Sequence, residues 1–267
     1  MSNLAQRLGA AALFGPVLLM TVWYGGLPLL CAVGLFIVFC LREFGHMLAR
    51  NDLNPWILIA TCASLMWCGF AHVFGLQFWT SFFPGLFLLL LCLSLFQSAT
   101  SRPLANLATT LFGILYIGFL SSFIILVRNG AAPDGGFYAA LILSGIWASD
   151  VAAYFFGRRF GRRHPVPHIS PGKTEAGFIG GCLAAVAVTA WAGHALNLLS
   201  LNDGLLLGLI VGIGAPIGDL FESMIKREMG VKDTSQLIPG HGGLLDRFDS
   251  VLFVFPLAYF YLQLVKP

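Results

Sequence analysis

Ionisable side chains gather in one stretch of this otherwise apolar chain, from Asp219 to Ser250. Four residues follow the i, i+3, i+4 and i+7 spacing that brings side chains onto one helical face: Asp219, Glu222, Ser223 and Lys226. Asp246 and Asp249 are three residues apart, and they follow the glycine-rich run 239–243. Carboxylates bind Mg²⁺ through oxygen, lysines neutralise phosphate, and a glycine turn lets backbone N–H groups approach phosphate closely. The stretch therefore predicts metal-assisted chemistry on a nucleotide polyphosphate.

A plainer explanation of this stretch is a solvated loop whose charges balance each other. That explanation leaves the turn His241-Gly242-Gly243 without a purpose. It also does not account for two sets of carboxylates at helical spacing. We therefore favour a functional site.

A second polar segment, from Trp147 to Thr174, has residues that suit the same chemistry. One helical stripe in it contains Trp147, Asp150, Tyr154 and Arg158. Asp150 is expected to be buried among alanines and aromatics, where it could bind a metal ion or orient a cation that binds phosphate. The neighbouring Arg159, Arg162 and Arg163 are more typical of a basic cluster that touches anionic lipid head groups.

The run Ser170 to Thr174 contains a Gly-Lys-Thr turn just before the next apolar stretch. Such a turn can offer backbone N–H groups, the Lys173 ammonium and a hydroxyl to phosphate. It is equally compatible with an ordinary helix cap. Pro167 stands where a P-loop needs its first glycine, so the run is not a Walker A motif.

The elements that must position these residues are membrane helices. The chain has 267 residues, of which 58% are hydrophobic and only 10% charged, whereas a soluble domain has about 25% charged residues. Apolar runs of membrane-spanning length predict an all-α integral membrane protein with about nine transmembrane helices. The expected spans are 8–24, 27–41, 55–75, 78–97, 107–127, 137–157, 176–196, 204–225 and 250–265.

The distribution of lysine and arginine predicts the orientation of these spans. If the 158–174 loop is cytoplasmic, 13 of the 15 lysines and arginines face the cytoplasm, and only Arg128 and Lys266 lie outside. The N-terminus and the polar site are then cytoplasmic, and the C-terminus lies outside.

Ionisable residues within the expected spans occur almost only in the second half of the chain. We therefore assign residues 131–267 to a catalytic transmembrane region. Residues 1–130 are expected to pack, to shape a lipid groove or to dimerise. Gly212, Gly214 and Gly218 lie in one apolar span without a preceding strand pattern, so they indicate close helix packing rather than a dinucleotide-binding turn.

The spacing of the polar residues resembles that of the phosphatidate cytidylyltransferases, the CDP-diacylglycerol synthases. The resemblance runs without a gap over 27 residues: Ser223, Lys226-Arg227, Lys232-Asp233, His241-Gly242-Gly243, Asp246-Arg247 and Asp249. The segments from Trp147 to Gly161 and from Ser170 to Thr174 resemble the same family in the same order.

This resemblance implies a bacterial inner-membrane enzyme of phospholipid biosynthesis that joins CTP to phosphatidic acid among the membrane lipids. It implies that Asp219 and Asp246 hold Mg²⁺ or another divalent cation, with Asp150 or Asp249 nearby, and it leaves room for a second cation. Residues expected to act on the phosphates are Lys173, Lys226 and Arg227. Residues expected to bind substrate are Tyr154, Arg158, Ser170, Thr174, Ser223, Lys232, Asp233, His241, Gly242, Gly243 and Arg247. A homodimer is compatible with the resemblance, and nucleic acid is not an expected partner.

Two other readings of the sequence stay open. Another CTP-using lipid enzyme, either a polyprenol kinase or an archaeal-lipid cytidylyltransferase, would use similar groups. A secondary transporter could also place carboxylates at the middle of the membrane, but it predicts two related halves with broken helices. No such internal repeat is visible in the sequence.

Overall fold

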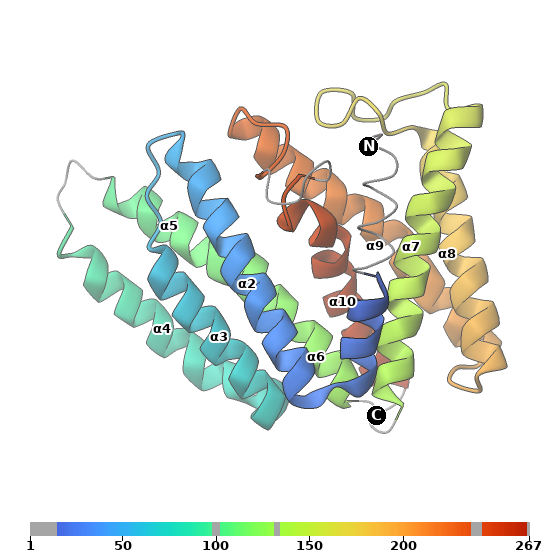
Figure 1. Cartoon of the computed structure of the whole chain (residues 1–267), viewed down its shortest axis with the longest axis horizontal. Helices are drawn as coiled ribbons and strands as arrows, with labels where there is room; N and C mark the ends of the chain where they lie inside the picture. Colours follow the sequence, from blue (N-terminus) through green and yellow to red (C-terminus); the bar gives the residue numbers. More distant parts are fainter. Residues whose placement is uncertain (1–14, 98–101, 131–133, 236–241, 266–267) are drawn as a thin grey trace. The chain divides into compact units, whose positions relative to one another are not determined.

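The described elements of the chain are all helices (Figure 1). The computed structural model describes residues 15–97, 102–130, 134–235 and 242–265. Within these residues, seven helical stretches are long and apolar enough to cross a membrane. The prediction of an all-α, multi-pass membrane protein is therefore confirmed. The helices are Gly15–Tyr24, α2 (Gly26–Ala49), α3 (Ile57–Phe74), η1 (Gly75–Phe78), α4 (Trp79–Ser94), α5 (Pro103–Gly113), η3 (Ile114–Phe119), α6 (Leu120–Gly130), α7 (Gly135–Phe160), α8 (Glu175–Ala195), α9 (Leu201–Glu228) and α10 (Leu245–Val265).

The predicted count of nine spans is not confirmed by these stretches. Two predicted spans, 55–75 and 78–97, fall in the single helical stretch Ile57–Ser94, which contains α3, η1 and α4. The first predicted span is described only as the short helix Gly15–Tyr24. The count of nine stays a prediction.

One predicted boundary needs correction. The second span was expected to end at residue 41, but α2 continues to Ala49. Hydropathy reports where the chain becomes polar, and a helix does not have to end there. The loop after this helix is accordingly shorter than predicted.

The chain forms two compact units. Unit 1 consists of Met1–Asn129 and Asp233–Leu245, and unit 2 consists of Gly130–Lys232 and Asp246–Pro267. The short segment Asp233–Leu245 thus belongs with the N-terminal helices, although it comes late in the sequence. The functional division predicted at residue 130 stays a prediction.

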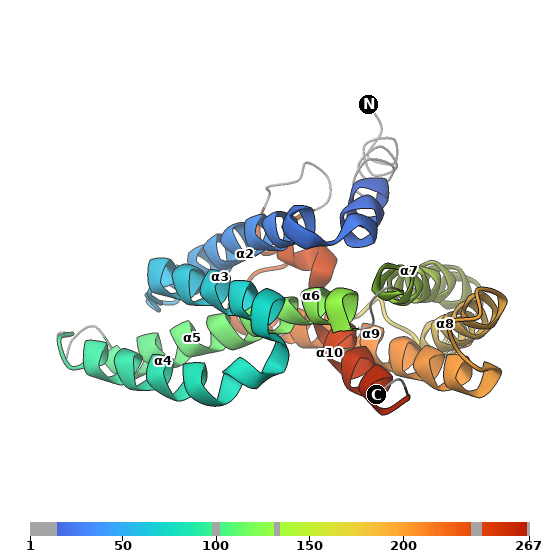
Figure 2. The same cartoon turned by 90° about the horizontal axis from the view of Figure 1, so that it is seen from below.

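In unit 1, helices α3 and α4 form a hairpin joined by the 3₁₀ turn η1 (Figures 1 and 2). Aromatic rings hold the hairpin together: the ring of Trp67 on α3 lies 5.3 Å from that of Phe82 on α4, and Phe70 on α3 stacks on Phe78 of the turn at 4.0 Å. Such offset and edge-on pairs stabilise packing beyond the apolar area that they bury.

In unit 2, helices α8 and α9 approach each other along a row of glycines. Gly204, Gly208 and Gly212 are one helical turn apart on α9 and face the α8 backbone. A methyl group placed on them would lie 2.8 Å from the Cα of Ala190, 2.5 Å from that of Val186 and 2.7 Å from that of Cys182, respectively. Other glycines of α9 face α10: a methyl group at Gly218 would lie 2.6 Å from the Asp249 carbonyl oxygen. The close packing predicted for the glycines of this span is confirmed.

We expect alanine at Gly208 or Gly212 to lower the stability of the protein by about 1–3 kcal/mol, because the added methyl group forces the two backbones apart. Thermal unfolding of the detergent-solubilised variants measures the effect. Gly69→Ala in α3 is the matched control, since no other atom lies within 4 Å of its added methyl group. An unchanged midpoint for Gly208→Ala and Gly212→Ala would contradict the packing.

Candidate active site

The end of α9 and the first turn of α10 form a buried ionic cluster in unit 2. The Lys226 Nζ lies 2.6 Å from Oδ1 of Asp246 and 3.2 Å from Oε1 of Glu222. Glu222 and Lys226 are one helical turn apart on α9, whereas Asp246 comes from α10. These three side chains are at most 10% exposed. One ammonium group therefore balances two carboxylates in a site shielded from water.

A second ion pair joins the loop before α8 to α9. The Lys173 Nζ lies 2.8 Å from Oδ2 of Asp219 and donates a hydrogen bond to the Pro216 carbonyl oxygen at 3.1 Å. The other Asp219 oxygen accepts a hydrogen bond from the Ser223 hydroxyl at 3.3 Å. The Asp219 side chain is 42% exposed. Its carboxylate is thus accessible to a ligand, unlike the carboxylate of Glu222.

Two further aspartates lie within electrostatic range of Asp219. Asp249 on α10 is buried, and its Oδ1 accepts a hydrogen bond from the Ser250 backbone N–H at 2.6 Å. Asp150 on α7 interacts electrostatically with Lys173 and Arg247 as well. Asp150 is exposed in the chain, so the expectation that alanines and aromatics bury it is wrong.

The donor set of this cluster fits a magnesium ion. Among the described residues, no three His, Cys, Asp or Glu side chains are grouped so that they alone could hold a metal ion. Mg²⁺ is usually bound by only one or two carboxylates, with water and substrate phosphates completing its shell. The exposed carboxylate of Asp219 suits that mode of binding.

The loop from α7 to α8 is held by contacts that also occupy several predicted site residues. Thr174 caps α8, because its hydroxyl accepts a hydrogen bond from the Gly177 backbone N–H at 3.1 Å. Arg227 of α9 donates to the Ile169 carbonyl oxygen at 3.2 Å. The exposed Arg158 donates to the Tyr154 hydroxyl at 3.1 Å. The helix-cap reading of Thr174 is confirmed, and its role toward phosphate stays a prediction.

The remaining predicted residues are more dispersed. Ser170 lies in the same loop, and its backbone carbonyl oxygen accepts a hydrogen bond from the Lys173 backbone N–H at 3.2 Å. Lys232 follows α9 and is exposed. Asp233 is exposed and belongs to unit 1. His241 lies outside the described residues.

The Gly242–Gly243 turn in unit 1 lies against Glu43 of α2, a residue that was not predicted from the sequence as part of the site. The carboxylate of Glu43 accepts hydrogen bonds from the Leu244 backbone N–H at 2.9 Å and the Leu245 backbone N–H at 3.0 Å. Gly242 has a φ of 80°, a conformation that glycine adopts without strain. Glu43 comes two residues after the end of the predicted span 27–41. A carboxylate so close to the end of an apolar span was the sequence signal that could have identified it.

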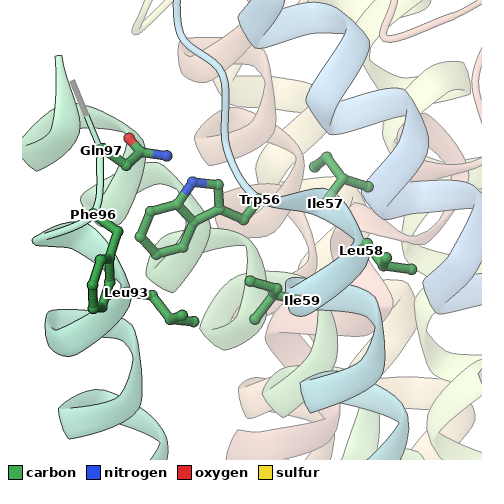
Figure 3. A pocket seen from close by; sticks show the side chains of 7 residues that line it. All are labelled: Trp56, Ile57, Leu58, Ile59, Leu93, Phe96 and Gln97. Atoms are coloured by element: carbon green, nitrogen blue, oxygen red, sulfur yellow. The ribbon is translucent and has the colours of Figure 1, made fainter. Parts of the chain in front are cut away.

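Unit 1 has an open pocket that is lined mostly by apolar side chains, unlike the ionic cluster of unit 2 (Figure 3). Its volume is about 520 Å³, and its lining combines the start of α3 with the end of α4: Trp56, Ile57, Leu58, Ile59, Leu93, Phe96 and Gln97. None of these side chains is ionisable. The pocket therefore offers apolar contact and no group for phosphate chemistry.

Comparison with known proteins identifies the family of nearly the whole chain. The model of the Cytidylyltransferase family matches residues 5–265. A protein named phosphatidate cytidylyltransferase from Synechocystis sp. is 34% identical over 97% of this chain and 95% of its own length. Proteins of the same name from Brucella suis and Bacillus subtilis are also similar. The first is 32% identical over 98% of this chain and 94% of its own length, and the second is 42% identical over 56% of each chain.

Proposed function

Because this chain belongs to the cytidylyltransferase family, we propose that it is a phosphatidate cytidylyltransferase, which joins CTP to phosphatidic acid. The products are CDP-diacylglycerol and pyrophosphate. The observation that carries this proposal is the similarity, over nearly the full length, to proteins with that name. The chain is a multi-pass membrane enzyme of the nucleotidyltransferase class, and a lipid substrate suits that setting.

The proposed reaction is an in-line displacement at the α-phosphorus of CTP. A phosphate oxygen of phosphatidic acid forms the new P–O bond. The bond from the α-phosphorus to the oxygen that bridges it to the β-phosphorus breaks, and pyrophosphate leaves with that electron pair. The protein has little covalent work to do, so the rate depends on positioning and on charge neutralisation.

We assign the phosphate contacts to the cations of the described cluster and its surroundings. Lys173 and Lys226 are each paired with an aspartate at 2.8 and 2.6 Å, and they can exchange that partner for a phosphate oxygen. Arg227, at the end of α9, is near the loop that contains Ser170 and Thr174, since it bonds to Ile169. The other substrate-binding residues proposed from the sequence are Tyr154, Arg158, Ser223, Lys232, Asp233, His241, Gly242, Gly243 and Arg247.

We propose that Asp219 and Asp246 hold a divalent cation, Mg²⁺ in the first place, with Asp150 and Asp249 nearby. The oxygen ligands available in the cluster support this. It contains five carboxyl groups, those of Asp150, Asp219, Glu222, Asp246 and Asp249, beside Lys173, Lys226 and Arg247. A divalent cation bound to carboxylates of this cluster would add positive charge where the anionic triphosphate binds. When bound, the metal ion would neutralise the triphosphate and polarise its phosphorus–oxygen bonds.

The proposed location is a bacterial inner membrane with the active site on the cytoplasmic side, where CTP is available. The bias of lysine and arginine toward one side supports this orientation, with the N-terminus inside and the C-terminus outside. A homodimer is part of the proposal.

The proposed function is tested with the purified protein, CTP, Mg²⁺ and phosphatidic acid in detergent micelles. Pyrophosphate and CDP-diacylglycerol should appear in equal amounts, and neither should form without phosphatidic acid. Release of CDP together with a phosphorylated lipid would identify a kinase instead. Turnover that ignores phosphatidic acid but uses another lipid phosphate would replace the proposed substrate.

A further inference from the structure

Glu43 is a buried carboxylate that receives four hydrogen bonds from described residues of unit 1. Its side chain lies on α2, and the residue is 4% exposed. Oε1 accepts from the Ser235 hydroxyl at 2.5 Å and the Leu244 backbone N–H at 2.9 Å. Oε2 accepts from the Thr234 hydroxyl at 3.3 Å and the Leu245 backbone N–H at 3.0 Å. All four of these donors are neutral groups. Hydrogen bonds from neutral donors to a carboxylate are stronger than hydrogen bonds between two neutral groups.

These bonds hold two places in the segment 233–245 that are separate in the sequence. Thr234 and Ser235 lie near the start of this segment, whereas Leu244 precedes α10 and Leu245 is its first residue. The residues before α10 are two glycines and a leucine, none of which has a side chain that can cap a helix. Glu43 therefore satisfies two N–H groups at the start of α10 that the local sequence cannot satisfy.

The turn is packed tightly against the same carboxylate. A methyl group placed on Gly243 would lie 2.7 Å from the Glu43 Oε2 and would also collide with the Thr234 hydroxyl. The glycine thus allows the turn to close directly over Glu43. Because Asp246 follows Leu245 immediately, the first turn of α10 that contains this proposed metal ligand begins at the residues that Glu43 holds.

We propose that Glu43 is a positioning residue, which holds the Gly242–Gly243 turn in place. The effect of this role on CTP binding rests on the proposed function. The carboxylate fixes the turn and the start of α10 in one conformation. The turn, which we expect to bind a phosphate of CTP, then does not have to be ordered when CTP binds. Glu43 itself does not touch the substrate.

Glu43→Gln tests this role with almost no change in size. Each carboxylate oxygen accepts two donors, whereas an amide has only one accepting oxygen, and its NH₂ group must face two other donors. We expect backbone amide exchange at Leu244 and Leu245, measured without substrate, to be about tenfold faster or more, because the loss of a hydrogen bond to a charged group is large enough for that change. The KM for CTP should rise by about the same factor. Glu43→Asp, which keeps both acceptors, should recover part of each effect.

His46→Gln is the matched control, because His46 lies one turn further along α2 with its side chain exposed. It should change neither the exchange rate nor the KM for CTP. A purely structural role for Glu43 would lower the thermal midpoint and the amount of active enzyme, and it would leave the KM for CTP as in the unmodified protein.

The outcomes separate this inference from the proposed function. Unchanged amide exchange at Leu244 and Leu245 in Glu43→Gln overturns the positioning role, whatever the enzyme does with CTP. Faster exchange with an unchanged KM for CTP leaves Glu43 as a structural residue and likewise overturns it. An unmodified protein that does not turn over CTP overturns the proposed function, while the exchange measurement still reports on the hydrogen bonds.

Discussion

Replacing Lys226 with methionine is expected to lower CTP turnover roughly a thousandfold, the upper range for loss of one group that stabilises transition-state charge. The same variant should also lose stability. Lys226 lies between Asp246 and Glu222, at 2.6 and 3.2 Å, and methionine removes the ammonium group that balances these two buried carboxylates. Removing one partner of a buried ion pair costs about 3–5 kcal/mol. Pyrophosphate release measures the first effect, and thermal unfolding in detergent measures the second.

A second substitution separates these two effects. Glu222→Gln in the Lys226→Met background removes one of the uncompensated charges, so it should recover part of the lost stability. It should recover none of the turnover, because the ammonium group is still missing. Arg50→Met is the control, since it removes an exposed cation that has no proposed role at the site. A Lys226→Met protein that keeps turnover within tenfold of the unmodified enzyme would show that Lys226 does not act on phosphate.

Asp219→Asn should also abolish Mg²⁺-dependent turnover, with a loss of roughly a thousandfold, but it should leave the protein folded. The Asp219 side chain is 42% exposed, and its ion pair with Lys173 is partly open to water. Exposed ion pairs contribute only about 0–1 kcal/mol to stability, so the thermal midpoint should change little. Turnover measured against the Mg²⁺ concentration tests the metal role. An asparagine variant with the unmodified activity and Mg²⁺ dependence would exclude it.

Asp246→Asn provides the informative comparison with Asp219→Asn. Both variants should lose turnover, but only Asp246→Asn should also lose stability, because Asp246 is buried against Lys226. Glu228→Gln is the matched control, since it neutralises an exposed carboxylate at the end of α9. Two variants with equal stability would contradict the difference in burial between the two aspartates.

Spacing along one helix was enough to predict part of the site. The helical spacing correctly placed Asp219, Glu222, Ser223 and Lys226 on one face of the regular helix α9. On that face Lys226 pairs with Glu222, and Ser223 donates a hydrogen bond to Asp219. The glycines of the same helix were correctly predicted to allow close packing. In each case the predicted relation depends on the helical repeat alone, which the sequence contains in full.

Contacts between distant segments could not be predicted in this way. Lys226 meets Asp246 across the chain segment between α9 and α10, and Glu43 meets Leu244 over a separation of 201 residues. No periodicity connects such positions. The exposure of Asp150 was mispredicted for a related reason, since apolar neighbours in sequence do not determine which side of a helix packs against other helices.

The hairpin of α3 and α4 has a consequence for how the chain enters the membrane during biosynthesis. Its connection, the 3₁₀ turn Gly75–Phe78, has four residues and no charged side chain. So short a connection leaves no separate loop that the insertion machinery could translocate after α3 is already in place. The two helices must therefore insert together, in a single step.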